Sequence, residues 1–196
     1  MDIQQLSFQE TGRFSTLICD YLSAKEELKP FYGAFPELNN FAAQIEIKKK
    51  SFLSSHRIQL VLSLRDQYSV LKPKAEVIKN IDLLEQENTF TITTGHQLCL
   101  MTGPLYFIYK IISTINLCIQ LKRKYPKSNF VPIYWMASED HDFEEVSSFR
   151  FKNKNVKWPG ETGGAVGDLS LDNLQEVLDV FEKNLGSLPE AIMTVS

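Results

Sequence analysis

The chain has 196 residues, 43% of them hydrophobic, with a formal net charge of −3 and a pI of about 5.7. This is enough for one globular domain, or for one domain and part of a second. Basic residues form no stripe, so nothing indicates nucleic-acid binding. The three cysteines are widely spaced, which favours a reducing compartment over a disulfide framework. Neither a signal peptide nor a membrane span is indicated, and we expect a cytoplasmic protein.

The N-terminal part of the chain is predicted to be helical. Apolar residues recur at helical spacing over residues 14–28 and again over residues 74–87. Between them, residues 41–71 contain neither Gly nor Pro, which predicts one long helix or two stacked helices ended by Pro73. We expect residues 1–87 to form a helical segment that packs on the core of the protein.

The middle of the chain has the pattern of a βαβ unit, which we place at residues 88–148. Residues 89–94 are β-branched or aromatic and predict a strand, and residues 131–136 predict a second one. The helix predicted between them begins with Pro104 at its first helical position. An apolar stripe follows along this helix: Leu105, Ile108, Ile112, Ile115 and Ile119. The helical crossover predicts parallel strands and an α/β fold, with ligands at the carboxyl ends of the strands.

The C-terminal part is less regular. Residues 149–158 predict a strand, residues 159–167 a glycine-rich loop, and residues 171–185 a helix. One βαβ unit is too little sheet for a doubly wound fold, and the chain ends in the apolar run 191–196. We therefore expect this chain to be the front part of a longer protein.

The loop after the first predicted strand is a candidate anion site. Backbone N–H groups between Gly95 and Gly103, together with the start of the next helix, can face a phosphate or carboxylate. His96 and Gln97 can add side-chain donors, and His96 can polarise an oxygen as charge develops. In the alternative interpretation the glycines only permit a tight turn, and His96 forms a local hydrogen bond.

The segment after the second predicted strand is strongly acidic. Residues 139–145 carry five carboxylates and His141. Asp140 and Glu144 share a face if the segment is helical, with His141 close by, and such a cluster can bind a cation or a ribose, or act as a general base. The alternative is an acidic cap of a surface helix, which accounts well for Asp142 and Glu145.

Three stretches together resemble a known family. Residues 94–97, residues 102–106 with Lys110, and residues 135–146 are similar to the corresponding motifs of the bacillithiol biosynthesis cysteine-adding enzymes, and the similarity extends over essentially the whole chain. The resemblance implies part of a Rossmann-like, nucleotidylyltransferase-type core. It also implies that residues 149–196 begin an inserted connecting segment, and that the full-length protein forms a homodimer through a C-terminal coiled coil outside this chain.

The resemblance further implies a ligase that forms an amide C–N bond. It would add L-cysteine to the amine of glucosaminyl-malate in the last step of bacillithiol biosynthesis, with ATP expected to activate the cysteine carboxylate. No metal, nucleic acid or membrane is implied. The residues expected to bind substrate or nucleotide are Gly95, His96, Gln97, Gly103, Tyr106 and Lys110, and those expected to orient or deprotonate the attacking amine are Asp140, His141 and Glu144.

Two other functions remain open from the sequence. A metal-dependent hydrolase would use His96, Asp140, His141 and Glu144, and would hold a stoichiometric metal ion. A non-catalytic binding or assembly module would instead pack its long helices on a partner. Under the ligase interpretation, we expect the chain to be inactive without the remainder of the protein.

Overall fold

The computed structural model describes residues 4–160 and 163–185. Its contacts divide the chain into two compact units, with the boundary between Lys72 and Pro73. Within the described ranges, no helix is both long and apolar enough to cross a membrane. The apolar run 191–196, from which we predicted a longer protein, lies outside the described residues.

The first unit consists of short helices: α1 (Thr16–Leu22), the 3₁₀ helices η1 (Glu26–Phe31) and η2 (Leu38–Asn40), α2 (Phe41–Ser51) and α3 (Ser54–Ser69). The first helix is shorter than predicted because Ala24 takes a φ of 51°, in the left-handed region, which ends the helical turn. Of the two arrangements expected for residues 41–71, the structure has two helices, interrupted at Phe52 and Leu53.

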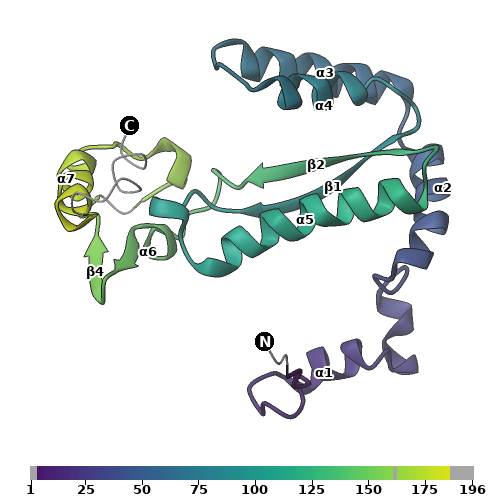
Figure 1. The fold of residues 1–196 in the computed structure, drawn as a ribbon, viewed down its shortest axis with the longest axis horizontal. Coiled ribbons are helices and arrows are strands. Elements are labelled where there is room, and N and C mark those ends of the chain that lie inside the picture. Colours follow the sequence, from purple (N-terminus) through teal and green to yellow (C-terminus); the bar gives the residue numbers. More distant parts are fainter. Residues whose placement is uncertain (1–3, 161–162, 186–196) are drawn as a thin grey trace. The chain divides into compact units, whose positions relative to one another are not determined.

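The second unit is built on a parallel βαβ arrangement. It contains α4 (Ala75–Leu83), β1 (Thr89–His96), α5 (Leu105–Lys124) and β2 (Asn129–Met136). The two strands pair in parallel from Thr89 opposite Asn129 to His96 opposite Met136. Helix α5 runs along both strands and packs on them (Figure 1). The predicted parallel strands and Rossmann-like α/β unit are therefore confirmed.

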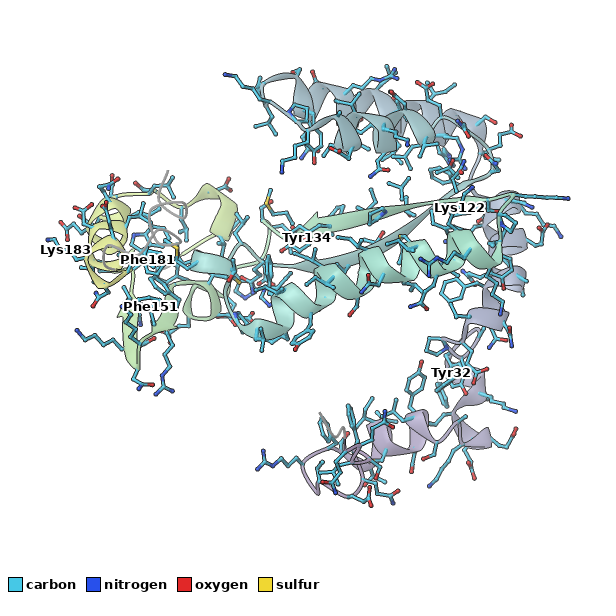
Figure 2. The ribbon with its side chains drawn as sticks, in the orientation of Figure 1. Tyr32, Lys122, Tyr134, Phe151, Phe181 and Lys183 are labelled. Carbon is cyan, nitrogen blue, oxygen red and sulfur yellow. The ribbon has the colours of Figure 1, made fainter. Side chains whose placement is uncertain are left out.

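Helix α5 buries a different face from the one predicted. Its buried residues are Thr114, Cys118 and Leu121, whereas the apolar stripe from Leu105 to Ile119 is exposed in the described structure. Both faces are apolar enough to pack, and the sheet takes the face with Cys118 and Leu121. At the end of this helix, Lys122 donates hydrogen bonds to Pro126 O, Ser128 O and Asn129 Oδ1, which ties α5 to the start of β2 (Figure 2).

The C-terminal part contains α6 (Phe143–Val146), β3 (Ser148–Phe151), β4 (Lys154–Lys157), the 3₁₀ helix η4 (Val166–Asp168) and α7 (Leu174–Leu185). The single strand predicted over residues 149–158 was wrong, because β3 and β4 form an antiparallel hairpin. Its two turn residues, Lys152 and Asn153, have φ values of 45° and 63°, as a tight hairpin turn requires. Phe151 lies against Phe181 of α7, with ring centroids 5.1 Å apart (Figure 2).

A separate apolar core holds this region together: Phe143, Val146, Phe149, Trp158, Val166 and Val177. Backbone hydrogen bonds from Val166 N to Asp140 O (2.7 Å) and from Gly167 N to Ser138 O (2.9 Å) attach the acidic segment to η4. A Cβ atom at position 167 would lie 2.7 Å from Ser138 Cβ, so only glycine permits this approach. The position of the acidic segment thus depends on residues well beyond the βαβ unit.

Candidate functional site

The paired strands bring the two predicted chemical segments to the same edge of the sheet. The last parallel pair is His96 opposite Met136, so Gln97 and the acidic segment both begin where the strands end. Helix α5 begins at this edge as well, and it contributes Tyr106 and Lys110 from its first turns. Ligands of parallel sheets bind at this location.

Three side chains at this edge form a continuous hydrogen-bond network. The Tyr106 hydroxyl donates to Glu145 Oε1 at 2.9 Å, and His96 Nε2 lies 2.6 Å from the same hydroxyl and 3.3 Å from Glu145 Oε1. Because a tyrosine hydroxyl has a single hydrogen, its oxygen must accept from His96, which places a hydrogen on Nε2. The His96 side chain is 7% exposed and that of Glu145 is 38% exposed, so the network extends from the interior to the surface.

Gln97 holds the other oxygen of the same carboxylate. Its Nε2 donates to Glu145 Oε2 at 2.9 Å, and the residue is only 5% exposed. Within the described residues, Gln97 Oε1 is buried without a hydrogen-bond partner. Glu145 is therefore held at both oxygens, while one strong acceptor beside it is unused.

The carbonyl groups at the end of β1 are also bound by side chains. Tyr134 of β2 (Figure 2) donates its hydroxyl to His96 O at 2.8 Å. Lys110 Nζ donates to Gly95 O at 2.9 Å. The Lys110 ammonium also lies 5.7 Å from the centroid of the Tyr106 ring. A lysine ammonium has further N–H donors, so Lys110 can bind an anion without releasing Gly95.

The loop between β1 and α5 has a strained backbone. Met101, Thr102 and Gly103 all have positive φ angles, and a Cβ atom at Gly103 would lie 2.6 Å from Cys99 Cβ. The expectation that Pro104 is the first helical residue was wrong: Pro104 is the N-cap, with ψ 153°, and the helix begins at Leu105. Gly103 N donates to Leu100 O, so this loop N–H is not available to an anion, whereas the first N–H groups of α5 have no acceptor within the helix.

Burial and the charge of Glu145 affect two neighbouring acids. Burial, followed by the hydrogen bond to Glu145 and its charge, raises the pKa of Tyr106 to about 12. Burial, and then the charge of Glu145, also raises the pKa of Cys99, whose Sγ lies 3.3 Å from His96 Nδ1. Both groups therefore keep their protons at neutral pH, and Cys99 behaves as a packed thiol rather than as a thiolate nucleophile.

The three residues predicted to act on the amine, Asp140, His141 and Glu144, lie outside the hydrogen-bond network centred on Glu145. The prediction that Asp140 and Glu144 share a helical face was wrong, because α6 begins only after Asp142. Asp140 Oδ1 instead accepts from the backbone N–H of His141 at 2.7 Å. The side chains of His141 and Glu144 are 89% and 81% exposed, and Glu144 lies 3.4 Å from Lys157 Nζ.

Glu145 is the site residue that the sequence interpretation missed. Asp142 is the N-cap of α6, with its Oδ1 accepting from Glu145 N at 3.2 Å, so Glu145 occupies the third helical position. A carboxylate at that position commonly turns back to the N-cap N–H in a capping box. The Glu145 carboxylate instead points to Tyr106 and Gln97. In the sequence, only the Asp-x-x-Glu spacing of Asp142 and Glu145 indicated that this carboxylate has a defined position.

Within the part of the chain that the structure describes, the potential metal ligands at this edge are not arranged as a metal site. Over residues 4–160 and 163–185, no group of three or more His, Cys, Asp or Glu side chains is placed to hold a metal ion. In particular, His96 is bound to Tyr106, whereas His141 is exposed on the acidic segment.

Comparison with known proteins assigns the chain to a family. A sequence model described as "Bacillithiol biosynthesis BshC, N-terminal Rossmann-like domain" matches residues 1–194. The chain belongs to this family. Its relatives include proteins named "Putative cysteine ligase BshC". Those of Flavobacterium johnsoniae and Christiangramia forsetii are each 54% identical, over 95% and 92% of this chain, and that of Bacillus cereus strain AH187 is 29% identical over 93%. The chain spans 34% to 35% of the length of these BshC relatives.

Proposed function

We propose that this chain is the N-terminal part of a ligase that joins L-cysteine to the amine of glucosaminyl-malate, as the last step of bacillithiol biosynthesis. Membership of the BshC family and the printed names of its relatives support a cysteine ligase. The observation that carries the proposal is the network of His96, Tyr106 and Glu145 at the carboxyl edge of the parallel strands, with Gln97 bound to the same carboxylate.

The reaction forms a C–N bond between the carboxyl carbon of cysteine and the sugar amine. ATP would supply activation by converting a carboxylate oxygen into a leaving group. The start of α5, together with Lys110, fits its phosphates, because helix N-termini and a lysine ammonium both attract anions. In this proposal Gly95 and Gly103 shape the loop, and His96 and Tyr106 lie beside the reacting groups.

The amine must lose a proton to attack the activated carbonyl carbon. Asp140, His141 and Glu144 remain our proposed residues for orienting or deprotonating it, since all three are exposed enough to meet a substrate. The structure leads us to add Glu145, whose carboxylate is fixed at both oxygens and can stabilise positive charge on the amine.

The decisive experiment supplies the full-length protein with L-cysteine, glucosaminyl-malate and ATP, and detects product by mass. We expect a product equal to the two substrates minus water, formed only when ATP is present. Reactions without nucleotide and with other nucleoside triphosphates serve as controls. The absence of this product under every nucleotide condition would refute the ligase proposal.

A further inference from the structure

The side-chain carbonyl of Gln97 is a buried acceptor that lacks a donor. Gln97 is 5% exposed, and within the described residues its Oε1 makes no hydrogen bond. Exchanging the nitrogen and oxygen positions of the side-chain amide would still leave the oxygen without a donor. The oxygen would then face the Glu145 carboxylate, which is another acceptor. The charge of Glu145 thus fixes which end of the amide is left open.

The backbone carbonyl of Gln97, in contrast to its side-chain carbonyl, has polar groups close by. Gln97 O lies 3.3 Å from the Tyr134 hydroxyl, 3.6 Å from Cys99 Sγ and 3.2 Å from His96 Nδ1. With the His96 hydrogen on Nε2, the Tyr134 hydroxyl and the Cys99 thiol are the possible donors among these groups, and neither is directed to Oε1. Buried polar groups are nearly always paired, so an exception at a site calls for an explanation, and a donor that arrives with a ligand is one.

The charge of Glu145 indicates which kind of donor would bind Gln97 Oε1. Oε1 belongs to the same amide that donates to Glu145 Oε2, so a neutral acceptor and an anionic carboxylate lie side by side. Glu145 is 38% exposed at its side chain and Tyr106 is 45% exposed, so the carboxylate bound by the Gln97 amide is accessible from the surface. Two adjacent acceptors, one of them charged, select a cationic N–H donor over a hydroxyl or an anion.

We propose that Gln97 is a positioning residue that accepts an N–H hydrogen bond from a primary amine of the substrate, with Glu145 balancing the charge of that amine. This inference rests on the proposed ligase function, in which both substrates carry a primary amine. Gln97 acts here as an acceptor, in addition to the donor role expected from the sequence.

The test compares amines with amine-free analogues on the full-length protein by calorimetry. The ligands are glucosaminyl-malate and its N-acetylated form, and L-cysteine and 3-mercaptopropionate. We expect wild type to prefer one amine over its analogue by about tenfold or more, as a charged hydrogen bond provides. The pair whose preference is lost in Gln97→Met identifies which amine Gln97 holds.

Gln97→Met keeps the length of the side chain and removes the acceptor, so we expect it to abolish that preference. Gln175→Met is the matched control, because Gln175 likewise donates to a carboxylate, Asp179 Oδ1 at 2.9 Å, but lies exposed on α7. Gln175→Met should retain the wild-type preference. A Gln97→Met protein that still prefers the amine as wild type does would overturn the proposal.

If Gln97→Met does not fold, the wild-type measurements can still overturn the proposal, since equal affinity for both members of each pair contradicts an amine-selecting acceptor. Failure of the proposed function has a separate signature. In that case no ligation product forms, whereas failure of this inference leaves product formation intact and removes only the amine preference.

Discussion

The Tyr106 hydroxyl lies 2.9 Å from Glu145 Oε1, although the two residues are 39 positions apart in the sequence. The contact joins the first turn of α5 to the short helix α6. It also orders the protons of the site, because the tyrosine donates to Glu145 and must accept from His96. The chemistry of this edge therefore centres on the Glu145 carboxylate.

Neutralising Glu145 should impair ligation far more than neutralising its neighbour. We expect Glu145→Gln to lower kcat/KM of the full-length protein by about a hundredfold, the magnitude typical of removing one preorganised electrostatic group. Glu144→Gln removes only an exposed contact with Lys157 and should cause a smaller loss. Steady-state rates of product formation compare the two. A larger loss for Glu144→Gln would instead support the role predicted for Glu144 from the sequence.

Titration of Tyr106 should report the state of the network. Its pKa is raised to about 12, so the protonated form that donates to Glu145 is stabilised relative to a free tyrosine, which titrates near 10. This contribution to stability is complete below about pH 10 and is lost as the pH rises through about 12. We expect Glu145→Gln to shift this titration to lower pH.

The measurement is the ultraviolet absorbance of phenolate, taken as the difference between the full-length protein and its Tyr106→Phe variant. Repeating the pair in the Glu145→Gln background isolates the effect of the carboxylate. An identical Tyr106 titration in both backgrounds would show that Glu145 does not act on this hydroxyl.

Gly103→Ala should destabilise the loop before α5. Position 103 has φ 59° and ψ −150°, and an added Cβ would lie 2.6 Å from Cys99 Cβ. Strain and overlap together should cost on the order of 3 kcal/mol. Gly12→Ala is the matched control, because Gly12 has φ 62° with nothing within 4 Å, and backbone strain alone costs about 1 kcal/mol. In thermal unfolding of the full-length variants, Gly103→Ala should have a lower midpoint temperature than Gly12→Ala. A lower midpoint for Gly12→Ala would contradict the close approach to Cys99.

Removing the cap of α6 should displace Glu145. Asp142→Ala deletes the acceptor of the Glu145 N–H, a loss worth about 1 kcal/mol of stability. Asp142→Asn retains an accepting oxygen and should preserve both stability and ligation rate. Comparing the ligation rates and unfolding midpoints of the two variants separates the effect of losing the cap hydrogen bond from the effect of losing the charge of Asp142. Equal rates in Asp142→Ala and wild type would mean that the cap does not position Glu145.

The βαβ unit was predictable because its pattern is local. β-branched residues before Gly95, an apolar helix after Pro104 and a second apolar run at Val131 each carry their own signal, and the crossover rule makes the strands parallel. The buried face of α5 was not predictable in this way. Two sides of that helix are apolar, so periodicity alone cannot tell which one the sheet covers.

The sequence also could not show that Glu145, rather than one of the four carboxylates near it, belongs to the hydrogen-bond network. This depends on where α6 begins, and Asp142 ends the irregular stretch only one turn before Glu145. The hairpin at Lys152 and Asn153 was missed for a related reason. The usual Asn-Gly or Asp-Gly signal is absent, and only the tolerance of Asn153 for positive φ indicated a turn.

The close approach of Gly167 to Ser138 bears on where this protein can be shortened. A fragment ending just after α6 would retain the whole βαβ unit, the loop of His96 and Glu145 itself. It would lose the two backbone hydrogen bonds through which Val166 and Gly167 hold the acidic segment. Glu145 would then have no fixed place from which to meet Tyr106. The smallest piece able to form the intact site thus extends at least through η4, and a side chain larger than hydrogen at position 167 would disturb the site without contacting any of its residues.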